Sequence, residues 1–511
     1  MIYHKARNTS KEFFFHDYET FGIDPRLSQA SQFAGIRTDE DLNIIEGSEI
    51  NIYCSNRDDQ LPSPMACLVT RITPQHIEGQ DPEVVFNEYE FSKKINEEMS
   101  RPNTCNIGYN NVAFDDEWSR NLFYRNYLDP YEREWKNGCS RADGLFIVMM
   151  VYIYNPNILV FPDAKDENGN TLYDNNGNPL PSFKLEDLSA ANGIVHENAH
   201  DALSDVIALI GVLKIIKERD PFIFDYAMSS NNKNEVSNHL TRFRKEQKPF
   251  LHISSFYGKK NNSSSVVMQI GNSESNKNEV FVFDITQDPS VLETMSVDEI
   301  RENLYSKKDV LEEKGQERIG IKKIAVNKIP MFFDLSMIKG RAEDLGLKDQ
   351  SETLRRNKEK LKDLMSRINI GKKINDVFNV EYDKEPNPDK AIYQGFASNM
   401  DKSSMDFLHK NIENDNLLNY RPSFQTEKFN HLFVRFLGRN FKECMSDDEK
   451  STWYDFCREK LVSENDAEYN IEAYFREIEE LLETHRDNDA YVNILTELKE
   501  YGEEKRKLFN L

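Results

Sequence analysis

The sequence predicts a mixed α/β protein with three successive parts, and three observations support that fold class. Over residues 13–220, aromatic and β-branched segments with strand character alternate with helical patterns, which is typical of an α/β domain. Over 221–373, short strand-like segments are separated by Gly, Asn and Ser turns, which indicates a β-rich domain. Over 376–511, long helical patterns with blocks of Glu and Asp predict an α-helical domain.

Length and composition are those of a globular protein with several domains. A chain of 511 residues exceeds the size of one ordinary core. The sequence contains no apolar run long enough for a membrane-spanning helix, and its first residues lack the apolar segment of a signal peptide. The 6 cysteines form no Cys-x-x-Cys pair. We therefore expect a cytoplasmic protein with reduced thiols.

The formal net charge of -23 argues against a protein that coats nucleic acid without specificity. Phosphate binding needs Lys and Arg, and these occur in local tracks. The longest tracks are Arg242 to Lys248 and Arg355 to Lys362. Any one of these tracks is more often a solvated face than a binding site.

The stretch from Phe13 to Gly22 places two carboxylates two residues apart behind an aromatic run. In a β-strand Asp17 and Glu19 project to the same side, because the side-chain period is two. Two carboxylates this close repel each other unless a cation lies between them, and such oxygen ligands suit Mg²⁺ or Mn²⁺. The simpler interpretation is a surface strand with two solvated acids. Further strands are expected at 31–37 and 44–54, and a helix over about 81–99.

Two later stretches carry further candidate residues. Asp115 opens a helical pattern with two more acids, a position that also suits simple capping of the helix dipole. His200 and Asp205 lie five residues apart, or roughly 140° around one helix. The two side chains can therefore converge only if His200 belongs to the loop before the helix.

The helix that opens at Asp115 and its following loop interleave aromatic residues with arginines. Such a surface can stack unpaired bases while its cations hold phosphates. Ordinary core packing accounts for about half of these aromatic residues equally well. Arg120, Tyr131 and Trp135 are the candidates for contacts with a nucleic acid.

Taken together, the acids and the histidine form a specific set: Asp17, Glu19, Asp115, His200 and Asp205. The set resembles the DEDDh class of the DnaQ-like, RNase H-fold 3′→5′ exonucleases. The flanking sequences are similar to those of the bacterial exonuclease I family: Phe-His-Asp-Tyr-Glu-Thr-Phe-Gly, Gly-Tyr-Asn-Asn-Val-x-Phe-Asp-Asp-Glu and Asn-Ala-His-Asp-Ala. The similarity continues more thinly through Tyr393-x-Gly395-Phe396.

The resemblance implies an RNase H-like exonuclease domain, an SH3-like domain and a helical domain that close around single-stranded DNA. It implies that Asp17, Glu19, Asp115 and Asp205 hold two Mg²⁺ ions about 3.5–4 Å apart, with Mn²⁺ as a substitute. His200 would act as the general base. The implied reaction is 3′→5′ hydrolysis that releases 5′-mononucleotides during DNA repair and recombination.

The resemblance also implies substrate contacts and a partner. Glu19, Lys184 and Tyr226 would contact the DNA, together with the three residues named above. Lys184 stands where the family has an arginine, so a bidentate phosphate contact becomes a single one here. The single-stranded DNA-binding protein is the implied partner through its acidic C-terminal tail, which Arg355 and Arg356 could receive. A monomer is the expected state.

Two alternatives remain open. The first is a DEDDh exonuclease that acts on RNA; such enzymes are short single-domain chains, and the two additional domains argue against it. Comparison of digestion rates on matched DNA and RNA strands would decide. The second is an inert module that only binds DNA or a repair partner, which the presence of all five candidate side chains disfavours.

Overall fold

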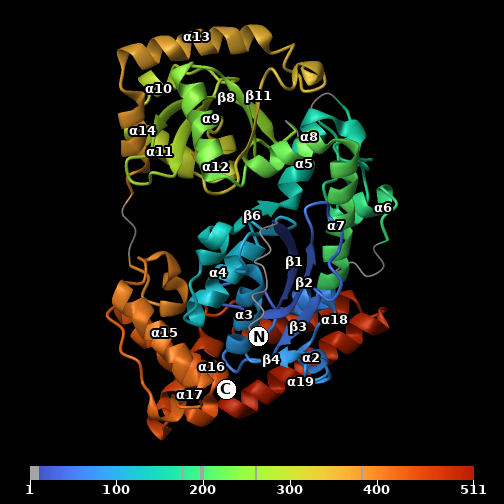
Figure 1. Cartoon of the computed structure of the whole chain (residues 1–511), viewed down its shortest axis with the longest axis vertical. Coiled ribbons are helices and arrows are strands. Elements are labelled where there is room, and N and C mark those ends of the chain that lie inside the picture. The colour runs from blue at the N-terminus through green and yellow to red at the C-terminus, as the bar shows by residue number, and fades with distance from the viewer. Residues whose placement is uncertain (1–10, 175–176, 196–200, 259–261, 381–383) are drawn as a thin grey trace, which may run out of the picture. The chain divides into compact units, whose positions relative to one another are not determined.

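The computed structural model describes residues 11–174, 177–195, 201–258, 262–380 and 384–511, which form two compact units (Figure 1). The first unit comprises Met1–Arg141, His196–Ile207 and Asp383–Leu511. The second comprises Ala142–Val195 and Ala208–Tyr382. Helix α7, Ala202–Arg219, begins in the first unit and continues into the second.

The first unit is built on a six-stranded sheet with the order β4-β3-β2-β1-β5-β6. Strand β1 lies inside this sheet, antiparallel to β2 and parallel to β5. The strands span Glu12–Thr20 (β1), Ala30–Thr38 (β2), Ile50–Cys54 (β3), Val85–Phe86 (β4), Thr104–Gly108 (β5) and Ser140–Asp143 (β6). The aromatic run before Asp17 therefore forms a buried central strand, as the sequence predicts.

Helices α3, Glu88–Met99, and α4, Asp115–Arg125, pack on one face of this sheet. Phe14, Tyr18 and Phe33 of the sheet share one apolar cluster with side chains of both helices. The helix expected over 81–99 starts only at Glu88, because Val85 and Phe86 pair with β3 as a short strand. Two short helices, α1 (Pro64–Thr70) and α2 (Pro74–Glu78), complete the N-terminal part of the unit.

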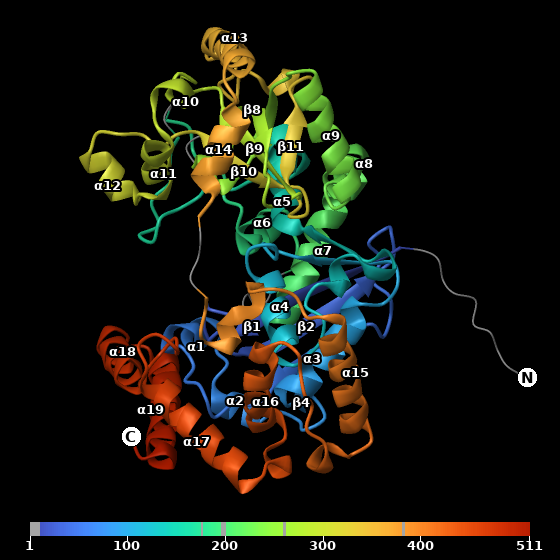
Figure 2. The ribbon, with the colours of Figure 1, turned by 90° about the vertical axis from the view of Figure 1, so that its left-hand side faces the viewer.

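The C-terminal part of the first unit is helical, as predicted. Its main helices are α15 (Asn399–Glu413), α16 (Glu427–Asn440), α17 (Asp447–Val462), α18 (Ile471–Thr484) and α19 (Asp489–Phe509). Figures 1 and 2 show these orange to red helices beside the blue strands and helices of the N-terminal part. Phe21, Tyr89, Tyr124 and Tyr127 share one apolar core with them. The two parts of this unit therefore fold as one body.

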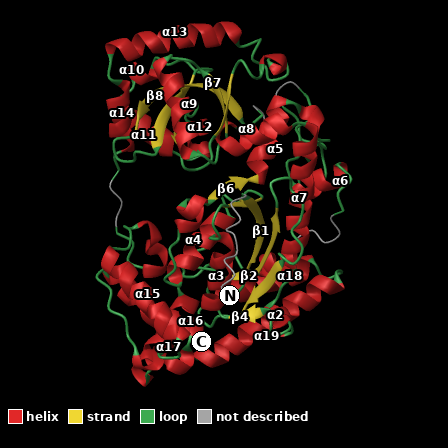
Figure 3. Ribbon diagram, in the orientation of Figure 1, coloured by secondary structure: helices red, strands yellow, loops and turns green. Residues whose placement is uncertain are grey.

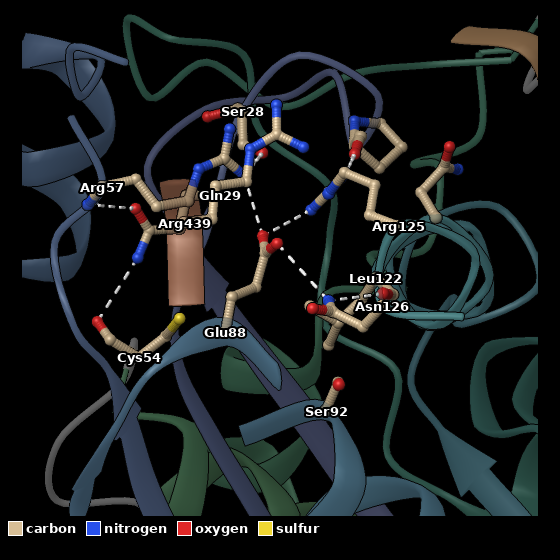
Figure 4. A network of polar contacts seen from close by, with 12 residues as sticks. Ser28, Gln29, Cys54, Arg57, Glu88, Ser92, Leu122, Arg125, Asn126 and Arg439 are labelled. Atoms are coloured by element: carbon tan, nitrogen blue, oxygen red, sulfur yellow. Dashed lines mark hydrogen bonds and ion pairs between the residues drawn. The ribbon is translucent and has the colours of Figure 1, made fainter. Parts of the chain in front are cut away.

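A buried ionic network joins the same two parts, and Figure 4 shows the contacts around Glu88 within it. Asp59 is fully buried and pairs with Arg57 at 2.8 Å, Arg439 at 2.8 Å and Lys460 at 2.9 Å. Glu88 pairs with Arg57 at 2.8 Å and with Arg125 at 2.9 Å. Each buried carboxylate thus faces at least two cations, which is the condition for charges to lie stably in an interior.

The second unit is built on a five-stranded antiparallel sheet with the order β10-β9-β8-β7-β11 (Figure 3). The strands span Phe250–Ile253 (β7), Ser264–Asn272 (β8), Glu279–Asp284 (β9), Ile321–Ala325 (β10) and Met331–Asp334 (β11). Val236, Leu240 and Phe243 of α9 pack on this sheet. The helices are α5 (Gly144–Tyr154), α6 (Leu185–Ala191), α8 (Pro221–Ser229), α9 (Lys233–Lys245), α10 (Val291–Thr294), α11 (Val297–Tyr305), α12 (Lys308–Glu313), α13 (Ser351–Arg367) and α14 (Ile370–Phe378).

The predicted class, an α/β part followed by a β-rich part and a helical part, is confirmed. The exact boundaries 13–220, 221–373 and 376–511 stay a prediction, since the two compact units divide the chain differently. None of the helices in the described ranges combines the length and the apolar character that crossing a bilayer requires.

Candidate active site

Strand β1 carries two of the predicted acids on one side. Its even-numbered residues Phe14 and Tyr18 face the apolar cluster under α3 and α4. Asp17 and Glu19 project from the opposite side, because successive side chains alternate along a strand. One oxygen of each lies within 4.8 Å of the other and of an oxygen of Asp205. The structure therefore brings the carboxylate oxygens of three of the four predicted metal ligands close enough together to share one metal ion.

Asp115 reaches the same strand from the start of α4. Strand β5 pairs with β1 only as far as Phe15 and Ile107, and the chain then turns into α4. Beyond this point the backbone N–H of Tyr18 donates to Oδ1 of Asp115 at 3.2 Å. Because Tyr18 lies between Asp17 and Glu19, this bond holds the fourth predicted acid next to the other three.

The two acids that follow Asp115 have different roles. Asp116 is fully buried and pairs with Arg133 at 2.8 Å and with Arg141. Burial opposes its ionisation, but the two guanidinium groups outweigh burial and hold the pKa of Asp116 below its usual value. Glu117 pairs with Arg120 at 2.6 Å. The simple capping interpretation is therefore insufficient for this acidic trio, since Asp115 and Asp116 are fixed by specific partners.

The start of α7 supplies the remaining acid. Asp205 lies in the first turn of that helix, and its backbone N–H donates to the carbonyl oxygen of Asp201 at 3.1 Å. His200 lies outside the described residues, so its position relative to Asp205 stays a prediction. Asp201 was not a candidate in the sequence. It accepts a hydrogen bond from Gln32 of β2 at 3.2 Å. Its negative charge also contributes to raising the pKa of Asp17.

The acidic cluster is electrostatically unfavourable without a cation. Burial raises the pKa of Asp17 well above its usual value, and the charges of Asp115, Glu19 and Asp205 raise it further. Burial and the neighbouring acids raise the pKa of Glu19 to about 9. Carboxylates in this state hold protons or bind a metal ion, and four hard oxygen donors suit Mg²⁺ or Mn²⁺. The donor set therefore fits a divalent cation.

The neighbouring His16 is not part of the site. Its ring is buried and stacks on Phe33 with ring centroids 5.9 Å apart. Burial lowers its pKa to about 3, so the ring is neutral at physiological pH. It belongs to the core behind β1.

The predicted DNA contacts on the first unit lie on α4 and in the segment that follows it. Trp135 is 65% exposed, and Tyr131 is partly exposed. Arg120 lies over the Tyr131 ring at 5.8 Å, but it is buried and pairs with Glu134 at 2.8 Å as well as with Glu117. Its charge is therefore already neutralised within the protein. The roles of these three residues toward DNA stay predictions.

The C-terminal part adds an aromatic residue that was not a candidate. Phe396 is 83% exposed, and its ring meets Tyr131 edge to face at 5.9 Å. The hydroxyl of Tyr393 donates to Glu117. The sequence shows a short segment with aromatic residues from Tyr393 to Phe396. No local pattern in the sequence predicts that this segment contacts Tyr131.

Lys184 and Tyr226 lie in the second unit, and their contacts with a substrate stay predictions. Lys184 is exposed just before α6 and lies 3.5 Å from Glu186. The Tyr226 hydroxyl donates to the carbonyl oxygen of Phe332 at 2.9 Å, and its ring stacks on Phe333 at 5.3 Å.

Comparison with known proteins gives consistent results. Residues 14–145 match the family described as "Exonuclease", residues 231–380 the "Exonuclease I SH3-like domain" and residues 386–505 the "Exonuclease I C-terminal domain". Exodeoxyribonuclease I of Haemophilus influenzae is 36% identical over 493 residues, which cover 96% of this chain and 98% of the relative.

Solved structures agree over the whole fold. The zinc-bound complex of Escherichia coli exonuclease I with single-stranded DNA has a TM-score of 0.86 and 33% identity, and it covers 97% of this chain and 100% of that one. An exonuclease I solved with SSB and an inhibitor has a TM-score of 0.83 and 31% identity, with 97% and 100% covered. The RNase H-like and SH3-like assignments of the first and second parts are thereby confirmed.

Proposed function

Because this chain belongs to the exodeoxyribonuclease I family, we propose that it hydrolyses single-stranded DNA from the 3′ end and releases 5′-mononucleotides. The observation that supports the proposal most directly is the cluster of Asp17, Glu19 and Asp205 oxygens within 4.8 Å, with Asp115 bonded to the same strand.

Each residue has a proposed role in this reaction. Asp17, Glu19, Asp115 and Asp205 hold two divalent ions, Mg²⁺ in the cell with Mn²⁺ as a substitute. When bound, these ions lower the pKa of the attacking water and neutralise charge at the scissile phosphate. His200 accepts the proton of that water, since the carboxylates are weak bases at neutral pH. Glu19 also contacts the terminal nucleotide.

The substrate is held by the aromatic surface of Tyr131, Trp135 and Phe396. Exposed rings bind unpaired bases by stacking, whereas the bases of a duplex are already stacked on each other. This surface therefore favours a single strand. Lys184 and Tyr226 are the proposed contacts on the second unit.

The direct test of this function compares four substrates. Single-stranded DNA, duplex DNA, single-stranded RNA of the same sequence and a DNA strand with a blocked 3′ end are each incubated with protein and Mg²⁺. We expect mononucleotides only from the single-stranded DNA with a free 3′ end, and none from the duplex, the RNA or the blocked strand. Faster digestion of RNA would favour the RNA-directed alternative, and binding without any digestion would favour the inert module.

A second proposal concerns a protein partner. We propose that the second unit binds the acidic C-terminal tail of the single-stranded DNA-binding protein through helix α13. Arg355 and Arg356 are exposed on this helix and form no ion pair within the described ranges. By contrast Arg367, on the same helix, pairs with Glu293 at 2.8 Å.

The pairing difference supplies the matched control for a binding experiment. Reversal of both charges, Arg355→Glu with Arg356→Glu, should weaken binding of a labelled tail peptide at least tenfold in fluorescence anisotropy. Arg367→Glu should change the affinity much less. Equal affinity of the double variant and the wild-type protein would place the tail on another surface.

A further inference from the structure

The turn that follows the metal-binding strand is held by a residue of the C-terminal part. Strand β1 ends at Thr20, directly after Glu19, and its register with β2 shifts between these two residues. The next residues, Phe21 and Gly22, are buried, whereas Ile23 is 80% exposed. The turn therefore carries one exposed apolar side chain, four residues after a proposed metal ligand.

Glu468 contacts this turn directly. It lies in the segment between α17 and α18, and its Oε1 accepts the backbone N–H of Ile23 at 2.7 Å. Its Oε2 lies 3.5 Å from the backbone nitrogen of Asp24. Backbone hydrogen bonds to a carboxylate are stronger than those to a neutral acceptor. One side chain, 445 positions away in the sequence, thus fixes two consecutive amides of the turn.

The turn is shaped to receive this carboxylate. A Cβ atom at Gly22 would lie 2.0 Å from Oε2 of Glu468, so no larger residue fits while Glu468 keeps its place. The far end of the turn is held as well, because Lys460 donates to the carbonyl oxygen of Leu27 at 3.2 Å. Thr20 Oγ1 donates to the Gly22 carbonyl oxygen at 2.7 Å within the turn itself.

We propose that Glu468 is a positioning residue for the exonuclease reaction: it fixes the turn so that Ile23 packs against the base of the terminal nucleotide. This inference rests on the proposed function. Four residues span at most about 14 Å, so Ile23 is within reach of a nucleotide whose phosphate is held at Glu19. A branched apolar side chain provides a surface for any base, which suits an enzyme that removes all four nucleotides.

The variants Glu468→Ala and Ile23→Ala test the proposal with steady-state kinetics on a short 5′-labelled oligothymidylate. Each should raise KM about three- to tenfold and leave kcat within about twofold, because ground-state binding of the base is lost. The double variant should show the same rise in KM as either single variant, since Glu468 acts through Ile23. Glu464→Ala, an exposed glutamate on the same segment, is the control and should behave like wild type.

Two further measurements separate positioning from a merely structural role. On an oligonucleotide whose 3′-terminal residue lacks its base, wild type and both variants should have the same KM. Glu468→Gln keeps one acceptor oxygen for the Ile23 amide and should recover most of the loss. A variant that only destabilised the fold would lower kcat on both substrates at unchanged KM.

The outcomes also distinguish this inference from the proposed function. If wild-type protein digests the single strand but Glu468→Ala leaves KM unchanged, the positioning role is wrong and the function stands. The same conclusion follows if the two single effects multiply in the double variant, or if they persist on the strand without a terminal base. If wild-type protein digests no strand, the proposed function itself fails.

Discussion

The carboxylates of Asp17 and Glu19 repel each other in the absence of a cation. In the folded protein the pKa of Glu19 is about 9, compared with an ordinary value of 4.5. The native state therefore binds more protons than the unfolded state between these two pH values, and stability falls as the pH rises through that range. In EDTA we expect the melting temperature to decrease from about pH 6 to pH 9, and Mg²⁺ to remove most of this decrease.

Replacement of one acid should relieve the same repulsion. Asp17→Asn should abolish hydrolysis, yet raise the melting temperature in EDTA at pH 8, because a neutral amide replaces a carboxyl group that must either take up a proton or bear a buried charge. Asp349→Asn, at an exposed aspartate, should leave both quantities unchanged. Thermal unfolding of the three proteins with and without Mg²⁺ measures the effect. A lower melting temperature for Asp17→Asn would show that its charge stabilises the fold and would contradict the metal assignment.

His200 can be tested by its chemistry. His200→Ala should lower turnover by about 10²–10⁴, the usual contribution of a positioned general base. Part of the loss should return as the pH is raised, because hydroxide replaces the base. Single-turnover rates on a short DNA strand from neutral to alkaline pH measure both effects. An unchanged rate at neutral pH would assign His200 a structural role.

At the scale of single elements, local patterns in the sequence predicted that Asp17 and Glu19 share one side of β1 and that Asp115 opens a helix. Alternation along β1 and the acid at the start of α4 both follow from side-chain periodicity and helix-end chemistry. The different roles of Asp115, which reaches the acidic cluster, and Asp116, which is buried against two arginines, could not be predicted in this way. They depend on Arg133 and Arg141, which reach Asp116 from distant positions, and on the point where β5 ends.

The aromatic segment after α4 gives a prediction at the same scale. Trp135→Ala should weaken binding of a short oligonucleotide about tenfold, since stacking of one base contributes roughly 1–3 kcal/mol. Leu508→Ala, at an exposed apolar residue near the end of α19, should have no effect. Binding is measured by fluorescence anisotropy in EDTA, where no hydrolysis competes. Equal affinities of Trp135→Ala and Leu508→Ala would show that Trp135 does not contact the DNA.

At the scale of the whole molecule, the C-terminal helices are part of the body that carries the active site. They share an apolar core with Tyr89, Tyr124 and Tyr127, and Arg439 and Lys460 neutralise the buried Asp59. Composition alone predicted a separate helical domain, because the partners of Tyr127 and Asp59 in that part lie more than three hundred positions away. A chain that ends before residue 376 would expose this core, so deletion is not a clean test of the helical part.

The ionic network gives a milder test of this coupling. Asp59→Ala should lower the free energy of unfolding by about 3–5 kcal/mol, since it removes one carboxylate partner from each of the buried cations Arg57, Arg439 and Lys460. Burial opposes ionisation of Asp59, but Arg439 and Arg57 hold its pKa well below 3.8, so the stabilisation is lost only as the pH falls below that value. Glu413→Ala breaks an exposed pair with Lys93 and should leave the free energy of unfolding almost unchanged, because solvent screens this pair. Urea unfolding measures both, and equal costs would show that the network contributes little.

We propose that the acidic cluster on β1 makes this chain a metal-dependent exonuclease that starts at the 3′ end of single-stranded DNA. The most direct measurement follows label release from 3′- and 5′-labelled strands, single and duplex, with Mg²⁺ and with EDTA. We expect the 3′ label to leave a single strand at once as a mononucleotide, while 5′-labelled strands shorten stepwise, and neither to occur in EDTA or with Asp17→Asn. Release that begins at the 5′ end, or that proceeds equally well in EDTA, would contradict the account.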